Sequence, residues 1–202
     1  MKKFFFMNSQ KLIRKTIVLL CLCLLNCSES EYSNLIKREM ATGVVHDSLL
    51  FDMKFGQRKQ EFFRACWKLN QKGVITNGPG NKTVKYELPL DVDAPLKSAM
   101  TLLFFGDFNE AKIMTGMDLQ FYYNAWSIWN KDLQAEKLVP VVKDSLKKWY
   151  PGNDFIKVPL EKDSTHLFVK VDGNRRIVIK PLDDNRLVKA KIDDLRYVLD
   201  EK

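Results

Sequence analysis

The sequence predicts an α+β protein built from two tandem lobes, each with one helix on an antiparallel sheet. Two segments have the apolar spacing of amphipathic helices, and short alternating segments typical of strands follow each one. This order places each helix on one face of its sheet. With 202 residues, 46% of them apolar and 29% charged, the composition is that of a globular protein and excludes disordered, collagen-like and disulfide-scaffold classes. We expect the first lobe at 49–124 and the second at 125–202.

Residues 1–26 are typical of a secretory signal peptide. A basic stretch ending at Lys15 precedes the apolar run 17–25, which as a helix spans only about 13 Å and is too short to cross a bilayer. The leader functions equally from Met1 or Met7, so the true start stays open. It holds five of the 33 basic residues and no acid, so the rest of the chain has a net charge of only +3. That balance does not favour nucleic-acid binding.

The end of the leader resembles the cleavage box of bacterial lipoproteins. It reads Leu24-Leu25-Asn26-Cys27-Ser28, with Asn26 where that family usually has Gly or Ala. The resemblance implies that Cys27 becomes the first mature residue and carries acyl chains, which anchor the protein in the cell envelope, with the outer membrane expected. An ordinary signal peptide cut at another position is the alternative. Whether the protein faces the periplasm or the surface stays open.

Residues 27–48 are predicted to form a tether, because they are polar and show little apolar periodicity. Cys21 and Cys23 leave with the leader and Cys27 is expected to carry lipid. Cys66 is then the one remaining thiol, so no intrachain disulfide is expected in an oxidising compartment.

The first lobe is predicted to open with a short strand at Phe51–Phe55, followed by a helix from Arg58 to Lys72. Phe62, Cys66 and Leu69 share one face of that helix, since they stand at i, i+4 and i+7. Strands are then expected at Val84–Leu88, Ser98–Phe105 and Lys112–Tyr123.

The second lobe is predicted to open with a helix from Gln134 to Trp149, on which Val142 and Leu146 face the core. Pro140 fits if the regular helix starts near Val139, because proline is tolerated in a first turn. The following strands are expected at Phe155–Leu160, Leu167–Val171, Arg175–Lys180 and Arg186–Ile192.

The start of the first lobe, Lys54-Phe55-Gly56-Gln57 followed by a helix and a strand closing near 109–113, resembles the small lipoprotein of the outer-membrane β-barrel assembly machine. Two such lobes in tandem resemble the β-lactamase-inhibitor protein. Both families are binders, so the resemblance implies a protein partner in the envelope and carries over no catalytic residue.

The hairpin around 172–174 predicts a basic sheet face. If all three residues form the loop, the core face carries Ile177 and Ile179 together with Leu167, Val169 and Val171. Lys170 then lies opposite Arg176 on the outside. This face is either solvated, discouraging edge pairing, or binds an acidic protein, a lipid headgroup or a glycan phosphate. The outward basic residues on this prediction are Lys157, Lys170, Arg176, Lys180, Lys189 and Lys191.

Aromatic residues cluster where the two lobes meet, at Tyr122, Trp126 and Trp129. Such side chains either pack the lobes together or serve as anchors for a partner.

Residues suited to catalysis are few. The two histidines are His46 and His166, and a Cys66–His166 dyad is the one conceivable nucleophilic pair. Cys66, however, lies on an apolar helix face, where a thiol behaves as a small hydrophobe. No Cys or His pair has metal-ligand spacing, and no metal or cofactor is expected. We therefore expect a non-enzymatic envelope lipoprotein that serves as a protein-interaction or assembly module. The alternatives are a binder of anionic envelope glycan or lipid through the basic sheet face, and an unrecognised hydrolase.

Overall fold

The computed structural model describes residues 30–90, 92–160, 165–180 and 182–200. The predicted signal peptide and the predicted lipid site at Cys27 lie outside these residues. Residues 35–202 form a compact unit that contains the whole sheet. Among the described residues, no helix has the length and apolar character that a membrane span requires.

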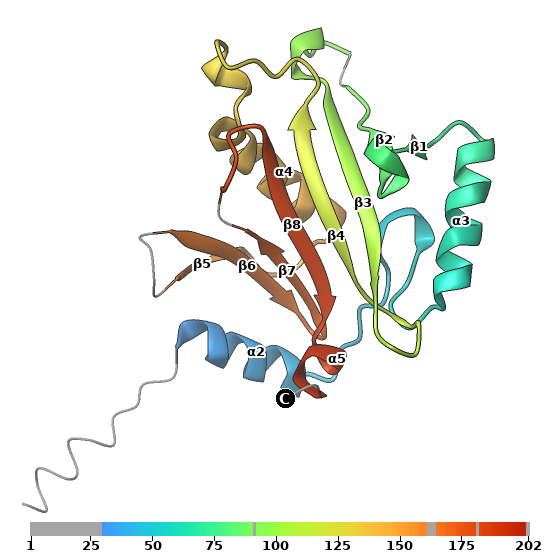
Figure 1. Cartoon of the computed structure of the whole chain (residues 1–202). Helices are drawn as coiled ribbons and strands as arrows, with labels where there is room; N and C mark the ends of the chain where they lie inside the picture. Colours follow the sequence, from blue (N-terminus) through green and yellow to red (C-terminus); the bar gives the residue numbers. More distant parts are fainter. Residues whose placement is uncertain (1–29, 91, 161–164, 181, 201–202) are drawn as a thin grey trace, which may run out of the picture. The chain divides into compact units, whose positions relative to one another are not determined.

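One antiparallel sheet of eight strands organises this unit, in the order β1-β2-β3-β4-β8-β7-β6-β5 (Figure 1). This confirms the predicted α+β class. The two four-stranded halves are joined through the β4–β8 pair, so a single sheet runs through both predicted lobes and the tandem division remains a prediction. The strands are β1 Thr76–Asn77, β2 Val84–Glu87, β3 Met100–Phe108, β4 Met114–Tyr123, β5 Ile156–Pro159, β6 His166–Asp172, β7 Arg175–Ile179 and β8 Leu187–Asp194.

Two of the helices lie against different parts of this sheet. Figure 1 shows α4 behind β4 and β8, and α3 beside the β1–β3 side. The α-helices are α2 Glu31–Ala41, α3 Lys59–Gln71, α4 Ala135–Trp149 and α5 Leu195–Asp200. Short 3-10 turns are η1 Leu50–Asp52, η2 Pro79–Asn81, η3 Leu96–Ser98 and η4 Lys131–Leu133.

Helix α3 agrees with the prediction. Its first turn is capped by Glu61, whose carboxylate accepts a 2.7 Å hydrogen bond from the backbone N–H of Arg58. Gly73 follows the last turn with a φ of 69°, a left-handed conformation that glycine adopts without strain.

Helix α4 starts at Ala135, four residues before the predicted regular start, so Pro140 lies inside it. An internal proline removes one helix hydrogen bond and costs about 3 kcal/mol. Leu138, Val142 and Leu146 are all buried against the sheet. Each such burial contributes roughly 1.5–3 kcal/mol, and together they outweigh the cost of the proline.

The core lies between α4 and one face of the sheet. Leu119 and Phe121 of β4, with Val188 and Ala190 of β8, are buried on this face. Trp149, at the end of α4, stacks on Phe121 with ring centroids 6.1 Å apart.

The strand predicted at Phe51–Phe55 is wrong. Phe51 and Asp52 have φ angles of 55° and 59° in the 3-10 turn η1, so the chain reverses here. The Phe51 ring packs edge-on against Tyr86 at 4.9 Å and lies 5.5 Å from Phe104. Packing of this aromatic group offsets a strain of about 1–3 kcal/mol per residue, which the sequence pattern could not reveal.

Part of the predicted tether 27–48 is folded. Helix α2 occupies 31–41, Leu35 is buried, and Glu39 accepts a 3.2 Å hydrogen bond from the backbone N–H of Gly173. We call residues 39–47 the strap, because they run along the end of the sheet at the β6–β7 turn. The strap makes polar contacts to residues far away in the sequence, and such contacts leave no apolar periodicity in the strap itself.

The predicted register of β6 and β7 is wrong by one residue. Lys170 pairs with Ile177, not with Arg176, and Asp172 pairs with Arg175. The loop is therefore the two residues 173–174, a length that suits a tight hairpin with its first residue at positive φ. The prediction assumed that no charge could lie on the core face.

In the observed register, Lys170 shares the core face with Ile177, while Val169 and Val171 lie on the opposite face with Arg176. Strand β5 pairs with β6, and its side chains also lie on the opposite faces from those predicted. Lys157 pairs with Phe168 and lies on the α4 side.

Candidate interaction surface

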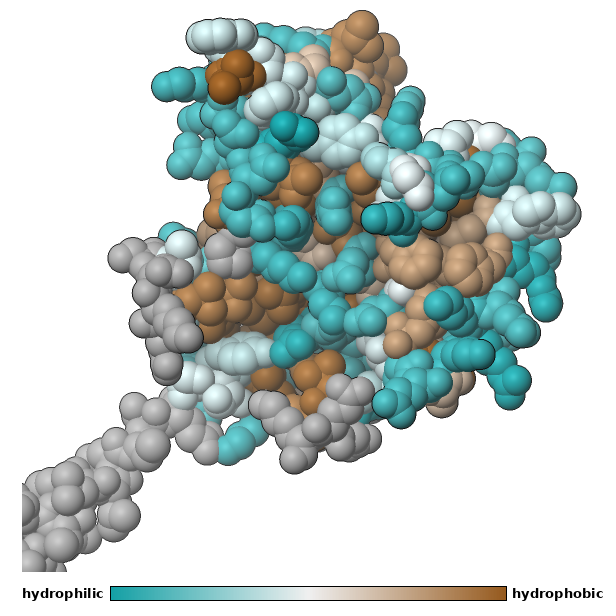
Figure 2. All heavy atoms as spheres, in the orientation of Figure 1, coloured by the Kyte–Doolittle hydropathy of each residue, from teal (hydrophilic) through white to brown (hydrophobic). Residues whose placement is uncertain are grey.

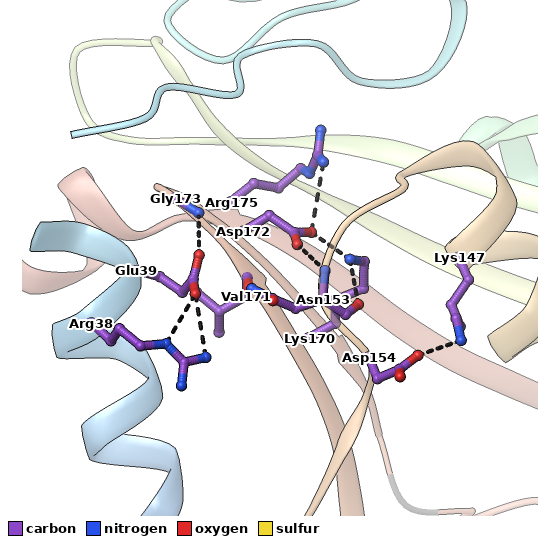
Figure 3. A network of polar contacts seen from close by, with 10 residues as sticks. All are labelled: Arg38, Glu39, Lys147, Asn153, Asp154, Lys170, Val171, Asp172, Gly173 and Arg175. Atoms are coloured by element: carbon purple, nitrogen blue, oxygen red, sulfur yellow. Dashed lines mark hydrogen bonds and ion pairs between the residues drawn. The ribbon is translucent and has the colours of Figure 1, made fainter. Parts of the chain in front are cut away.

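The six predicted basic residues do not share one face. Lys170 is 1% exposed, and its Nζ lies 2.6 Å from Asp172 Oδ2 and donates to the backbone oxygen of Asn153 at 2.6 Å (Figure 3). Burial lowers the pKa of the Lys170 amine, and the charge of Asp172 opposes that effect. Lys157 also lies on the α4 side, 5.8 Å from the Phe168 ring centroid. Lys157 and Lys170 therefore do not belong to the basic sheet face that the sequence predicted.

The other four basic residues lie on the face away from α4, but each has an acidic partner. Those partners neutralise the face locally, so it does not present the cationic surface that the sequence predicted. The pairs are Arg176–Asp193 at 2.7 Å, Lys180–Asp118 at 4.0 Å, Lys189–Asp183 at 2.6 Å and Lys191–Asp107 at 2.7 Å.

The three predicted aromatic candidates have different environments. Tyr122 is half-buried on β4. Trp126 packs at the junction, where its Nε1 donates to the backbone oxygen of Asn185 at 3.1 Å and the Arg186 guanidinium lies 4.8 Å from its ring centroid. Trp129 is 91% exposed. Of these three side chains, only Trp129 is therefore open to a partner.

Positive charge is concentrated elsewhere, on α3, β1 and β2. Residues 58–87 contain seven basic residues and two acidic ones, whereas the remaining chain after residue 26 has a net charge of −2. The net positive charge of the predicted mature chain therefore comes entirely from residues 58–87. The basic residues are Arg58, Lys59, Arg64, Lys68, Lys72, Lys82 and Lys85.

Helix α3 also exposes large aromatic side chains. Phe62 is fully buried, and Phe63 comes one residue later, about 100° further around the helix, where it is 49% exposed. Trp67 lies one turn beyond Phe63 and is 61% exposed. Figure 2 shows a hydrophobic patch between β3 and α3 on the visible face. Two aromatic residues outside the apolar stripe are the sequence signal for this surface, which was not predicted.

A groove of about 470 Å³ lies between α3 and the β1–β2 edge of the sheet. Its apolar walls include the buried Ile75 and the half-buried Cys66. This volume is in the range of roughly 300–1,000 Å³ typical of ligand sites. We call the groove, with exposed Phe63 and Trp67, the α3 surface. The groove is lined by Phe63, Cys66, Trp67, Asn70, Ile75, Thr76, Asn77 and Val84.

Cys66 does not form the conceivable catalytic dyad. Burial raises the pKa of its thiol to about 11, which keeps the thiol protonated at neutral pH. His166 begins β6, near the opposite edge of the sheet from α3 and β1. Within the described ranges, no group of three His, Cys, Asp or Glu residues is arranged to hold a metal ion.

A polar cluster at the β6–β7 end of the sheet holds the strap in place. The Arg175 guanidinium lies 4.7 Å from the Tyr150 ring centroid, with Asp172 3.8 Å away. Glu39 reaches the same turn from α2 (Figure 3). Burial raises the Glu39 pKa, but hydrogen bonds from Gly173 and Asn153, together with Arg38, outweigh burial and leave that pKa below its ordinary value. These contacts are internal, so the cluster stabilises the fold.

Comparison with protein-family models, with curated proteins and with solved structures found no match to this chain.

Proposed function

We propose that this protein is a non-enzymatic lipoprotein of the cell envelope that binds another envelope protein through the α3 surface. The observation that carries the proposal is the pair Phe63 and Trp67, about half-exposed beside an apolar groove. Aromatic side chains that remain exposed next to a concave apolar site are typical of the residues that dominate protein interfaces.

The leader and the box around Cys27 support the envelope location and the lipid anchor. Metabolic labelling with palmitate tests this part. We expect label on the full-length chain and none on Cys27→Ala, while Cys66→Ala keeps the label. Label that persists on Cys27→Ala would overturn the anchor.

Site-specific photocrosslinking in the cells that make the protein tests the interaction. We place the crosslinking amino acid at the position of Gln71, which is exposed on α3, and a control at the position of Lys148, exposed on α4. A discrete crosslinked protein is expected from position 71 only. The double variant Phe63→Ser/Trp67→Ser is expected to remove that product. An unchanged product in the double variant, or the same product from position 148, would refute the proposal.

The alternative, binding of anionic glycan or lipid through the β5–β8 sheet face, receives no support from the ion pairs of Arg176, Lys180, Lys189 and Lys191. We therefore do not assign that function.

A further inference from the structure

Positive charge without an acidic partner among the described residues lies on α3 next to the groove, about 100° around the helix from Phe63 and Trp67. Arg64 and Lys68 are exposed on α3, each one residue after an exposed aromatic side chain. Neither side chain is in an ion pair within the part of the chain that the structure describes. They differ in this respect from Lys180, Lys189 and Lys191, which have acidic partners.

The charge distribution limits what can occupy this surface. Two copies of the chain meeting through their α3 surfaces would bring a net +5 from each copy together, which disfavours a symmetric dimer there. A partner with carboxylates around the contact would instead be attracted. The apolar groove walls, with Ile75 buried between α3 and the sheet edge, suit an inserted apolar side chain.

We propose that the α3 surface binds an acidic peptide segment of its partner, with one aromatic or aliphatic side chain in the groove and flanking Asp or Glu residues near Arg64 and Lys68. This inference rests on the proposed function and adds the chemistry of the partner. The groove is concave and about 470 Å³ in volume, which favours a single inserted side chain over a flat membrane surface.

The probe is a fluorescein-labelled synthetic peptide, DEDLFEDE, titrated into the full-length chain in neutral detergent. Two comparison peptides replace its acids with Gln or its Leu-Phe with Ser-Ser. We expect the parent peptide to bind and to protect Cys66, which lines the groove, from N-ethylmaleimide, as read by mass spectrometry of the fragment containing Cys66. Both comparison peptides are expected to bind at least about tenfold more weakly.

Charge reversal on two helices supplies the matched control. Arg64→Glu/Lys68→Glu on α3 is expected to weaken parent-peptide binding about tenfold or more, with a smaller salt dependence. Lys137→Glu/Lys148→Glu makes the same charge change at exposed positions of α4 and is expected to leave binding unchanged. Circular dichroism melting establishes that each variant is folded before it is scored.

Several results would overturn the inference. These are equal binding of the Gln peptide, binding that leaves Cys66 unprotected, or equal effects of the α3 and α4 reversals. Protection of Cys66 by anionic phosphatidylglycerol nanodiscs, but not by the peptide, would assign the surface to lipid. If the crosslink from position 71 persists while the peptide fails, only the partner chemistry is wrong. If both fail, the proposed function fails too.

Discussion

Lys170 and Asp172 form an ion pair inside the protein, with Nζ 2.6 Å from Oδ2 and both side chains almost completely buried. The pair lies two residues apart on one face of β6, beside the core residue Ile177. It places charges where the alternation of β6 would predict apolar side chains.

The first prediction concerns this pair. Asp172→Asn leaves Lys170 buried without its counter-charge, and such a loss costs about 3–5 kcal/mol. We expect the urea midpoint to fall accordingly. The double variant Lys170→Met/Asp172→Leu is expected to recover only part of the loss, because the buried Arg175 also loses its acidic partner. Asp154→Asn removes an exposed partner of Lys147 and is the control, with no change expected. A midpoint for Asp172→Asn equal to that of the control would contradict the assignment.

The second prediction concerns Gly173 under the strap. Gly173 has a φ of 54°, and a methyl group on it would collide with the carbonyl oxygen of Val44. Gly173→Ala is therefore expected to displace the strap, and hydrogen exchange at the His46 amide, which donates to Asn174 Oδ1, is expected to accelerate. Gly73→Ala is the control, because Gly73 has a similar positive φ of 69° but open space around it. Equal exchange at His46 in the two variants would contradict a tight strap contact.

The third prediction is the pH dependence of Glu39. Its pKa lies below the ordinary value of 4.5 in the folded chain, so the unfolded chain binds this proton more readily. The stability from Glu39 is therefore fully present above the unfolded pKa and is lost as pH falls through the folded pKa. Glu39→Gln is expected to show less loss of stability between pH 5 and pH 3 (roughly the range around a carboxyl pKa) than the parent chain. Parallel urea-unfolding profiles for the two proteins would rule this out.

The fourth prediction concerns Cys66. Burial raises the pKa of its thiol to about 11 from an ordinary value of 9.0, so at pH 8 the thiolate fraction is about a hundredfold smaller than in an unfolded chain. Iodoacetamide is expected to modify Cys66 correspondingly more slowly in buffer than in urea, with the rate rising steadily from pH 8 to pH 10. Equal rates with and without urea would show that the thiol is not buried.

Much of the fold was accessible from local pattern. The spacing of Phe62, Cys66 and Leu69 predicted α3, and that of Val142 and Leu146 predicted α4, because one apolar stripe per helix is a local property. The alternation of β8 correctly turned Ala190 inward and Lys191 outward.

The candidate site was predicted less well. The sequence predicted a basic surface on the β5–β8 sheet through Lys170 and Arg176, but in the observed register Lys170 lies on the core face and forms a buried pair with Asp172. A pattern that assigns every charge to solvent cannot anticipate such a pair. Of the three aromatic candidates, Trp129 is the exposed one, whereas the exposed Phe63 and Trp67 lie on a helix that was predicted only from its apolar face.

By itself, the sequence determined the α+β class, the places of α3 and α4 and most strands, because these follow from periodicity within ten or fifteen neighbouring residues. Only the tertiary structure decided the strand register, the folded strap between Glu39 and Asp47, and the exposed aromatic side chains beside a groove. Each of these depends on residues far apart in the chain, whose contact energies become defined only when the sheet has assembled.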